Sequence, residues 1–447
     1  MDIRVLNTPL PEDLLKLKWN GQFELMNQII DQRLQKDLPS MLKERLKLEK
    51  EIIARMPLDF IYTKQQALDI LRERISDFKD EEFDALFADS AFEFIFKEGQ
   101  MYLKNNFFEN LIKTRLNYAQ RYVDHTEDAG AKLLDETIAA MKEKGELSCR
   151  IHVKSSIWID PAYEKEGKTV RVWLPVPKEY AQVEELQIIS MSHEGMVNDN
   201  EVEQRCVYFE KPYKKGERFT VEYSFLNHMK YVPLDPSAVT DYHPLKCLEE
   251  VKPHIVFTDD LRSLLKEIIG EETNPLIKAR KIYDYITSHI MYSFMRRYVT
   301  LPSIPQYCTT SMKGDCGVQA LTFITLCRMA GIPATWQAGL YATPLHIGNH
   351  DWARFYIEPY GWLYADCSFG GSAYRAGNEE RRDFYFGCLD PFRIPCSSAF
   401  QGTRVPAKTY LENDPYDNQN GEIEYADEGI PCQYVHHETE EIEIRIL

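Results

Sequence analysis

Three side chains in the second half of the chain have the types and the order of a cysteine nucleophile site. Cys316 stands in a Gly-Asp-Cys-Gly segment, His350 is followed by Asp-Trp, and Asp366 ends a Gly-Trp-Leu-Tyr-Ala-Asp segment. A thiolate can attack a carbonyl carbon, an imidazole can move the proton, and a carboxylate can orient the imidazole. The pattern predicts Cys316, His350 and Asp366 as a catalytic triad.

A helix is predicted to begin at Cys316. Apolar or small side chains recur at helical spacing through positions 316, 320, 323, 327 and 330, and Gly331 ends the pattern. Asp315 is then the expected N-cap. A thiol in the first turn lies at the positive end of the helix dipole, which favours the thiolate. The unpaired N–H groups of that turn could also bind an oxyanion. The sequence does not identify a side chain that would donate a further hydrogen bond to the oxyanion.

His350 and Asp366 are expected on one hairpin, in which a Glu-Pro-Tyr-Gly turn separates two short strands. With a loop of three residues, 358–360, position 352 pairs with 366 and His350 lies diagonally across from Asp366 on the same face. A loop of four residues would place the two side chains on opposite faces. The triad therefore requires an odd loop or a bulge in this hairpin.

The residues beside the predicted triad are given no role in the chemistry. Asp351 and Cys367 are each next to a triad member in the sequence, so alternation should point them away from the site. Trp336, Tyr341 and Trp352 could line a substrate groove, but core packing is the preferred interpretation for these large side chains.

These segments resemble the transglutaminase-like superfamily, in which a Gly-x-Cys precedes a helix that ends in Gly-Ile-Pro-Ala. That helix is matched by residues 316–334, and the family's His-x-Trp and Gly-Trp-x-x-x-Asp elements are matched by 350–352 and 361–366. Asp351 replaces the small residue often found between the family's His and Trp. The resemblance implies an α+β, papain-like core, with a helix carrying the Cys packed on an antiparallel sheet carrying His and Asp. It also implies acyl transfer through a thioester.

Four segments are predicted along the 447-residue chain, since about 100–200 residues per domain is usual. The first is a helical domain, with helical spacing of apolar residues in 64–78, 81–102 and 107–144. The period then changes to two, which predicts a β-sandwich-like domain before the catalytic domain. An acidic extension ends in an alternating segment that predicts one late strand. The boundaries are 1–146 (helical), 147–250 (β-sandwich-like), 251–398 (catalytic) and 399–447 (acidic extension).

Composition limits the partners and the compartment. The net charge is −17, and no Lys/Arg run rises above this acidic background, so nucleic acid and anionic membrane are not expected partners. The longest nearly apolar stretch, 320–327, is far shorter than the roughly 20 residues of a membrane span, and no export signal is visible. The ten cysteines match no zinc pattern. We expect a cytoplasmic protein without metal or cofactor, acting on a protein or peptide substrate, in an oligomeric state that stays open.

The same triad serves two reactions on an amide. Transfer of the acyl group to water makes a cysteine peptidase or amidase, and transfer to an amine makes a protein-glutamine transamidase. Hydrolysis is preferred, because nothing in the sequence marks a lysine-binding tunnel. A non-catalytic scaffold that binds peptides is the alternative from another class.

Overall fold

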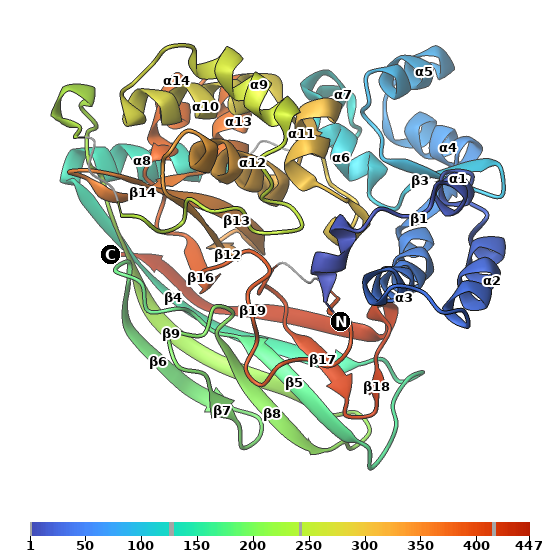
Figure 1. The fold of residues 1–447 in the computed structure, drawn as a ribbon. Coiled ribbons are helices and arrows are strands. Elements are labelled where there is room, and N and C mark those ends of the chain that lie inside the picture. The colour runs from blue at the N-terminus through green and yellow to red at the C-terminus, as the bar shows by residue number, and fades with distance from the viewer. Residues whose placement is uncertain (1, 125–128, 241–243, 414–416) are drawn as a thin grey trace. The chain divides into compact units, whose positions relative to one another are not determined.

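The computed structural model describes residues 2–124, 129–240, 244–413 and 417–447. These residues form helices and mostly antiparallel sheets, so the predicted α+β class is confirmed (Figure 1). The contacts divide the described residues into two compact units. The first contains 2–124, 251–256 and 290–315, and the second contains the others. Each unit joins segments that lie far apart in the chain, whereas the four predicted segments are consecutive.

The first unit is mainly helical and contains a small antiparallel sheet in the order β1-β3-β2, together with a short parallel pair, β10 and β11. Thr63 caps one of its helices: the hydroxyl accepts from the N–H of Gln66, whose side chain accepts from the N–H of Thr63. The elements are α1 Glu12–Trp19, α2 Phe23–Leu34, α3 Ser40–Arg55, β1 Phe60–Thr63, α4 Lys64–Arg74, α5 Asp80–Ala88, β2 Phe94–Lys97, β3 Gln100–Lys104, α6 Phe107–Thr114, α7 Leu116–Arg121, β10 Met291–Tyr292, α11 Ile304–Ser311 and β11 Lys313–Gly314.

The prediction of helix over 81–102 is wrong beyond Ala88. Ser90 has a φ of +54°, which no helix accommodates, and β2 and β3 follow it. Glu98 and Gly99 have φ values of +49° and +79°, and they form the two-residue turn between these strands. The predicted stretch 107–144 forms α6, α7 and α8, except that residues 125–128 lie outside the described residues.

The second unit contains the predicted β-sandwich-like domain. One sheet has the strand order β19-β4-β9-β6, and the other has the order β18-β17-β5-β8-β7 (Figure 1). The late strand predicted near the C-terminal end is present as β19, which pairs with β4, and β17 pairs with β5. The acidic extension thus supplies strands to both sheets. The strands are β4 Glu146–Ile159, β5 Thr169–Pro175, β6 Val183–Met191, β7 Met196–Val197, β8 Cys206–Pro212, β9 Arg218–Lys230, β17 Glu422–Tyr425, β18 Glu428–Gly429 and β19 Val435–Ile446.

A third sheet of the second unit carries the predicted His and Asp, in the antiparallel order β15-β14-β13-β12-β16. Figure 1 shows α9, α10, α12 and α13 together on one side of this sheet. Its buried residues Leu340 and Ile394 belong to the same apolar core as the sandwich. The elements are α9 Asp259–Ile269, α10 Pro275–His289, α12 Cys316–Met329, β12 Ala334–Thr343, β13 His346–Ile357, β14 Gly361–Ala365, α13 Cys367–Arg375, α14 Glu379–Phe384, β15 Phe386–Gly387 and β16 Arg393–Ser397.

Helix α8 (Ala129–Lys144) belongs to the second unit, although the sequence placed it with the N-terminal helices. Lys142 forms an ion pair with Glu380 at 2.9 Å, and the Asn378 amide donates to Asp135 at 3.0 Å. These contacts attach α8 to α14 and its N-cap. Within the described residues, every helix is too short or too polar to cross a bilayer.

Candidate active site

Helix α12 begins at Cys316, as predicted, and residues 317–328 of it are buried. The hydroxyls of Thr322 and Thr325 donate to the carbonyls of Val318 and Leu321, one turn earlier, so these two buried hydroxyls are satisfied. Gly331 ends the helix with a φ of +81°. The Cys316 side chain, at the mouth of the helix, is partly exposed.

The β13–β14 hairpin has the predicted geometry. Ile357 pairs with Gly361, so the loop consists of the three residues 358–360. The register places position 352 opposite 366, which brings His350 and Asp366 to one face. His350 Nε2 lies 2.7 Å from Asp366 Oδ2, and both side chains are buried.

Asp366 accepts three further hydrogen bonds. Arg393 Nη1 donates at 2.9 Å, and Ser368 Oγ and the Phe369 N–H each donate at 3.0 Å, so the carboxylate also caps α13. Together with His350, these groups fix the orientation of the carboxylate and leave it little freedom to rotate.

Arg393 is a residue of the candidate site that the sequence motifs missed. Its second amino group donates to Asp390 at 2.6 Å, and the side chains of Arg393 and Asp390 are fully buried. No spacing rule marks this pair. A signal does exist, because a single arginine inside the apolar segment Phe-Arg-Ile-Pro requires a buried acid as a partner.

The electrostatics favour a neutral imidazole beside an ionised carboxylate. Burial lowers the pKa of His350 below its usual value, and the neighbouring Asp366 offsets only part of this effect. Burial alone would raise the pKa of Asp366, but the interaction with His350, the positive charge of Arg393 and the hydrogen bonds that the carboxylate accepts outweigh it and hold that pKa below its usual range. A neutral His350 donates Nε2–H to Asp366, so Nδ1 is the nitrogen that can accept a proton.

The His350 ring lies among aromatic side chains. Its centroid is 4.7 Å from that of Phe369, 5.9 Å from that of Trp352 and 6.1 Å from that of Tyr341. Trp352 and Trp336 are buried, so the preferred interpretation of core packing is confirmed for both tryptophans. This packing restricts the imidazole to the orientation in which it meets Asp366.

The expectation that Asp351 points away from the site is wrong. The Cys316 thiol donates to Asp351 Oδ2 at 3.7 Å, and Gln419 Nε2 donates to Asp351 Oδ1 at 2.8 Å. Alternation does put Asp351 and His350 on opposite faces of β13. However, α12 packs on the Asp351 face, where Phe323 of α12 meets Phe355 with ring centroids 5.5 Å apart. The structure therefore joins His350 to Asp366 directly, and joins Cys316 to a residue outside the predicted triad.

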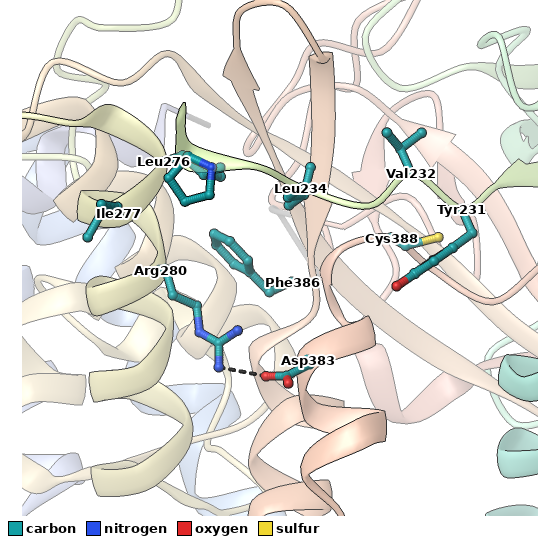
Figure 2. A pocket seen from close by; sticks show the side chains of 10 residues that line it. Tyr231, Val232, Leu234, Leu276, Ile277, Arg280, Asp383, Phe386 and Cys388 are labelled. Atoms are coloured by element: carbon teal, nitrogen blue, oxygen red, sulfur yellow. Dashed lines mark hydrogen bonds and ion pairs between the residues drawn. The ribbon is translucent and has the colours of Figure 1, made fainter. Parts of the chain in front are cut away.

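A second cysteine of this unit lies beside a cavity. This cavity of about 260 Å³ is lined by Leu234, Leu276 and Phe386, and Arg280 forms an ion pair with Asp383 there at 2.7 Å. Figure 2 shows these side chains and the ion pair. Cys388 lies at its wall, but burial raises the pKa of this thiol to about 12. Its Sγ donates to the Lys230 carbonyl at 3.2 Å. Cys388 is therefore a poor nucleophile compared with a thiol at a helix mouth.

Comparison with known proteins supports the family resemblance of the segment that contains the candidate site. Residues 262–367, which include all three predicted triad members, match the family model of the transglutaminase-like superfamily. An uncharacterized protein of Haemophilus influenzae is 23% identical over 45% of this chain. The chain spans 64% of that relative's length, which is less than two thirds.

Two solved structures are similar to parts of this chain. A candidate cysteine protease from Cytophaga hutchinsonii is 14% identical, with 68% of this chain and 90% of that chain covered and a TM-score of 0.38. The periplasmic domain of TgpA from Pseudomonas aeruginosa is 12% identical, with 51% and 98% covered and a TM-score of 0.29. The assignment of residues 262–367 to this superfamily rests on the match to the family model. Residues 262–367 form a transglutaminase-like core, the predicted resemblance is confirmed, and a cysteine-dependent enzyme is supported.

Proposed function

We propose that the protein transfers the acyl group of a peptide or protein amide through a thioester on Cys316, with water as the preferred acceptor. The observation that carries this proposal is the buried His350–Asp366 pair at 2.7 Å, on the hairpin that follows the Cys316 helix within the family match. A neutral imidazole held by an ionised carboxylate is the base that thiol enzymes use.

In the first half-reaction, Cys316 Sγ attacks the amide carbonyl carbon and its proton passes to His350 Nδ1. The carbonyl oxygen becomes an oxyanion, which the N–H groups of the first turn of α12 would stabilise. The C–N bond then breaks, and the leaving amine takes the proton from His350. In the second half-reaction, water attacks the thioester and gives a proton to His350. The C–S bond breaks, a carboxylic acid leaves, and the proton returns to the sulfur.

Asp351 is the rival acceptor for the thiol proton, because its carboxylate already accepts from Sγ. The two roles predict opposite variants. If His350 is the base, His350→Ala abolishes turnover whereas Asp351→Asn retains it. If Asp351 is the base, Asp351→Asn abolishes turnover and His350→Ala retains part of it. Rates on one peptide amide, with circular dichroism as the folding control, decide between them.

The acceptor is tested with a peptide substrate in the presence and absence of a fluorescent primary alkylamine, with Cys316→Ala as the control. A free carboxylic acid as the product supports hydrolysis, and incorporation of the amine supports transamidation. Binding of peptide by both the wild type and Cys316→Ala, without product, would favour the non-catalytic scaffold. Formation of either product by the wild type, with neither product formed by Cys316→Ala, supports the thioester route.

A further inference from the structure

The first unit contains an open cavity of about 680 Å³ that the proposed reaction does not use. Much of the cavity wall is apolar and aromatic. Its residues come from the N-terminal helices, from the region of β2 and from residues 296–313. A volume of this size is within the range of small-molecule sites, about 300–1,000 Å³. The apolar wall includes Leu10, Leu15, Phe92, Phe94, Ile95 and Pro302.

Two cations of the wall, Lys18 and Arg45, pair with a single acid. Lys18 Nζ lies 2.8 Å from Glu49 and Arg45 Nη1 lies 2.6 Å from it, and Glu49 is fully buried. Burial lowers the pKa of Lys18, and the positive charges of Arg45 and Arg296 lower it further, although Glu49 opposes them. The cations at this wall therefore repel one another.

A second acid of the cavity wall, Glu93, is also paired with two cations. Arg296 and Lys313 each lie 2.7 Å from Glu93, which also accepts from the Tyr307 hydroxyl at 2.7 Å. Glu93 is almost fully buried, and the two cations are 84% and 90% buried, since their side chains are 16% and 10% exposed. Four buried cations thus face two carboxylates around the cavity, in a chain whose overall charge is −17.

One buried donor of Arg45 lacks an acceptor within the described part of the chain, although the guanidinium is paired with Glu49. This side chain lines the cavity and is only 4% exposed, and its Nε has no hydrogen-bond partner among the described residues. Leaving a buried donor of a charged group unpaired costs about 1–3 kcal/mol or more. A bound anion would supply both the missing acceptor and the missing negative charge.

We propose that this cavity binds a small amphipathic anion, with a carboxylate or phosphate head group at Lys18, Arg45 and Arg296 and an apolar body against the aromatic wall. The charge excess selects the sign of the ligand, and the Arg45 donor selects an oxyanion over a halide. The apolar wall selects a body that an inorganic anion lacks. This site is separate from the proposed thioester chemistry and does not depend on it.

The test measures binding by isothermal titration calorimetry on the full chain with decanoate, decyl phosphate and decyltrimethylammonium. We expect the two anions to bind, and the stronger of them identifies the head group. We expect the cation with the same alkyl chain to bind at least about tenfold more weakly. Equal binding of the cation, or equal binding of inorganic phosphate and decyl phosphate, would overturn the proposal.

The variants separate this site from the surface. Lys18→Met should weaken decyl phosphate or decanoate binding about tenfold, whereas Lys16→Met on the same helix should not, because Lys16 is exposed. Arg296→Gln is the second variant, since Glu93 keeps Lys313 and Tyr307 and the fold is expected to survive. Thermal unfolding checks each variant. Wild-type affinity in both folded variants would show that the cavity is not the binding site.

Discussion

The Cys316 thiol and the Asp351 carboxylate lie 3.7 Å apart, although one begins a helix and the other lies inside a strand. Asp351 is 3% exposed, and Gln419 holds its other oxygen. A carboxylate this close disfavours a second negative charge, so it opposes the helix dipole at the sulfur. The reactivity of the nucleophile is therefore set by two opposed neighbours.

Replacement of Asp351 by asparagine should release this opposition. The amide keeps the shape and can keep a contact with Gln419, but it carries no charge. We expect Asp351→Asn to alkylate at Cys316 severalfold faster than the wild type at the same pH, by the iodoacetamide rate. Asp383→Asn, a change at an exposed carboxylate of the same unit, is the control. An unchanged or slower rate in Asp351→Asn would contradict this electrostatic account.

Selective labelling tests whether Cys316 is the reactive thiol. Seven of the ten cysteines are buried, so the comparison is among Cys247, Cys316 and Cys432. Burial raises the pKa of Cys247, which slows the reaction of this thiol. We expect peptide mapping after brief exposure to iodoacetamide below pH 7 to find Cys316 modified first. Equal labelling of the three thiols would remove the argument for an activated nucleophile.

Arg393 should be essential to the stability of the site. Arg393→Met leaves the carboxylates of Asp366 and Asp390 buried without their cation, and breaking a buried pair in this way costs about 3–5 kcal/mol. The exposed arginine of the Arg445–Glu443 pair gives the matched control, since Arg445→Met should cost about 0–1 kcal/mol. Urea unfolding measures both. A cost for Arg393→Met no larger than the control would show that the network contributes no net stability.

The pH dependence follows from the lowered pKa of His350. A base works only in its neutral form, and burial keeps the imidazole neutral at pH values where an ordinary histidine, with a pKa of about 6.5, is already protonated. We expect the acidic limb of kcat/KM against pH to have its midpoint below 6.5. Because the pKa of His350 is lower in the folded state, the folding free energy that the neutral imidazole contributes is fully present above pH 6.5. This contribution is lost as the pH decreases through the folded-state pKa. A midpoint above 6.5 would be incompatible with His350 as the buried base.

The loss of turnover should differ among variants of the three predicted triad residues. Cys316→Ala should reduce turnover to background, and His350→Ala should reduce it nearly as far. Asp366→Asn is preferable to alanine, because asparagine can still cap α13 while it removes the charge that orients the imidazole. Its defect should be smaller than that of His350→Ala, and adding it to Cys316→Ala should change nothing, since members of one catalytic unit are not additive. A full loss in Asp366→Asn with wild-type stability would make the carboxylate more than an orienting group.

Local sequence rules predicted the two elements that carry Cys316, His350 and Asp366. Helix α12 begins at Cys316 because an apolar run and Gly331 define its two ends, and the hairpin register follows from its three-residue loop. Asp351 was misplaced because alternation tells which side chains share a face, but not which face the helix covers. Arg393 was missed because its partners come from separate elements. The strands β2 and β3 were missed because helical and strand spacing are ambiguous over short apolar runs.

The buried Glu93 has a consequence for how the chain is made. It lies before the β-sandwich in the sequence, but its partners Arg296, Tyr307 and Lys313 come about 200 residues later, and the Tyr307 bond spans 214 residues. At about 5–20 residues per second, a ribosome exposes the N-terminal helices well before these partners exist. The first unit is therefore finished after much of the second has emerged. An isolated N-terminal fragment would carry a buried acid without its cations, and deletion of that fragment would leave residues 290–315 without the surface they complete.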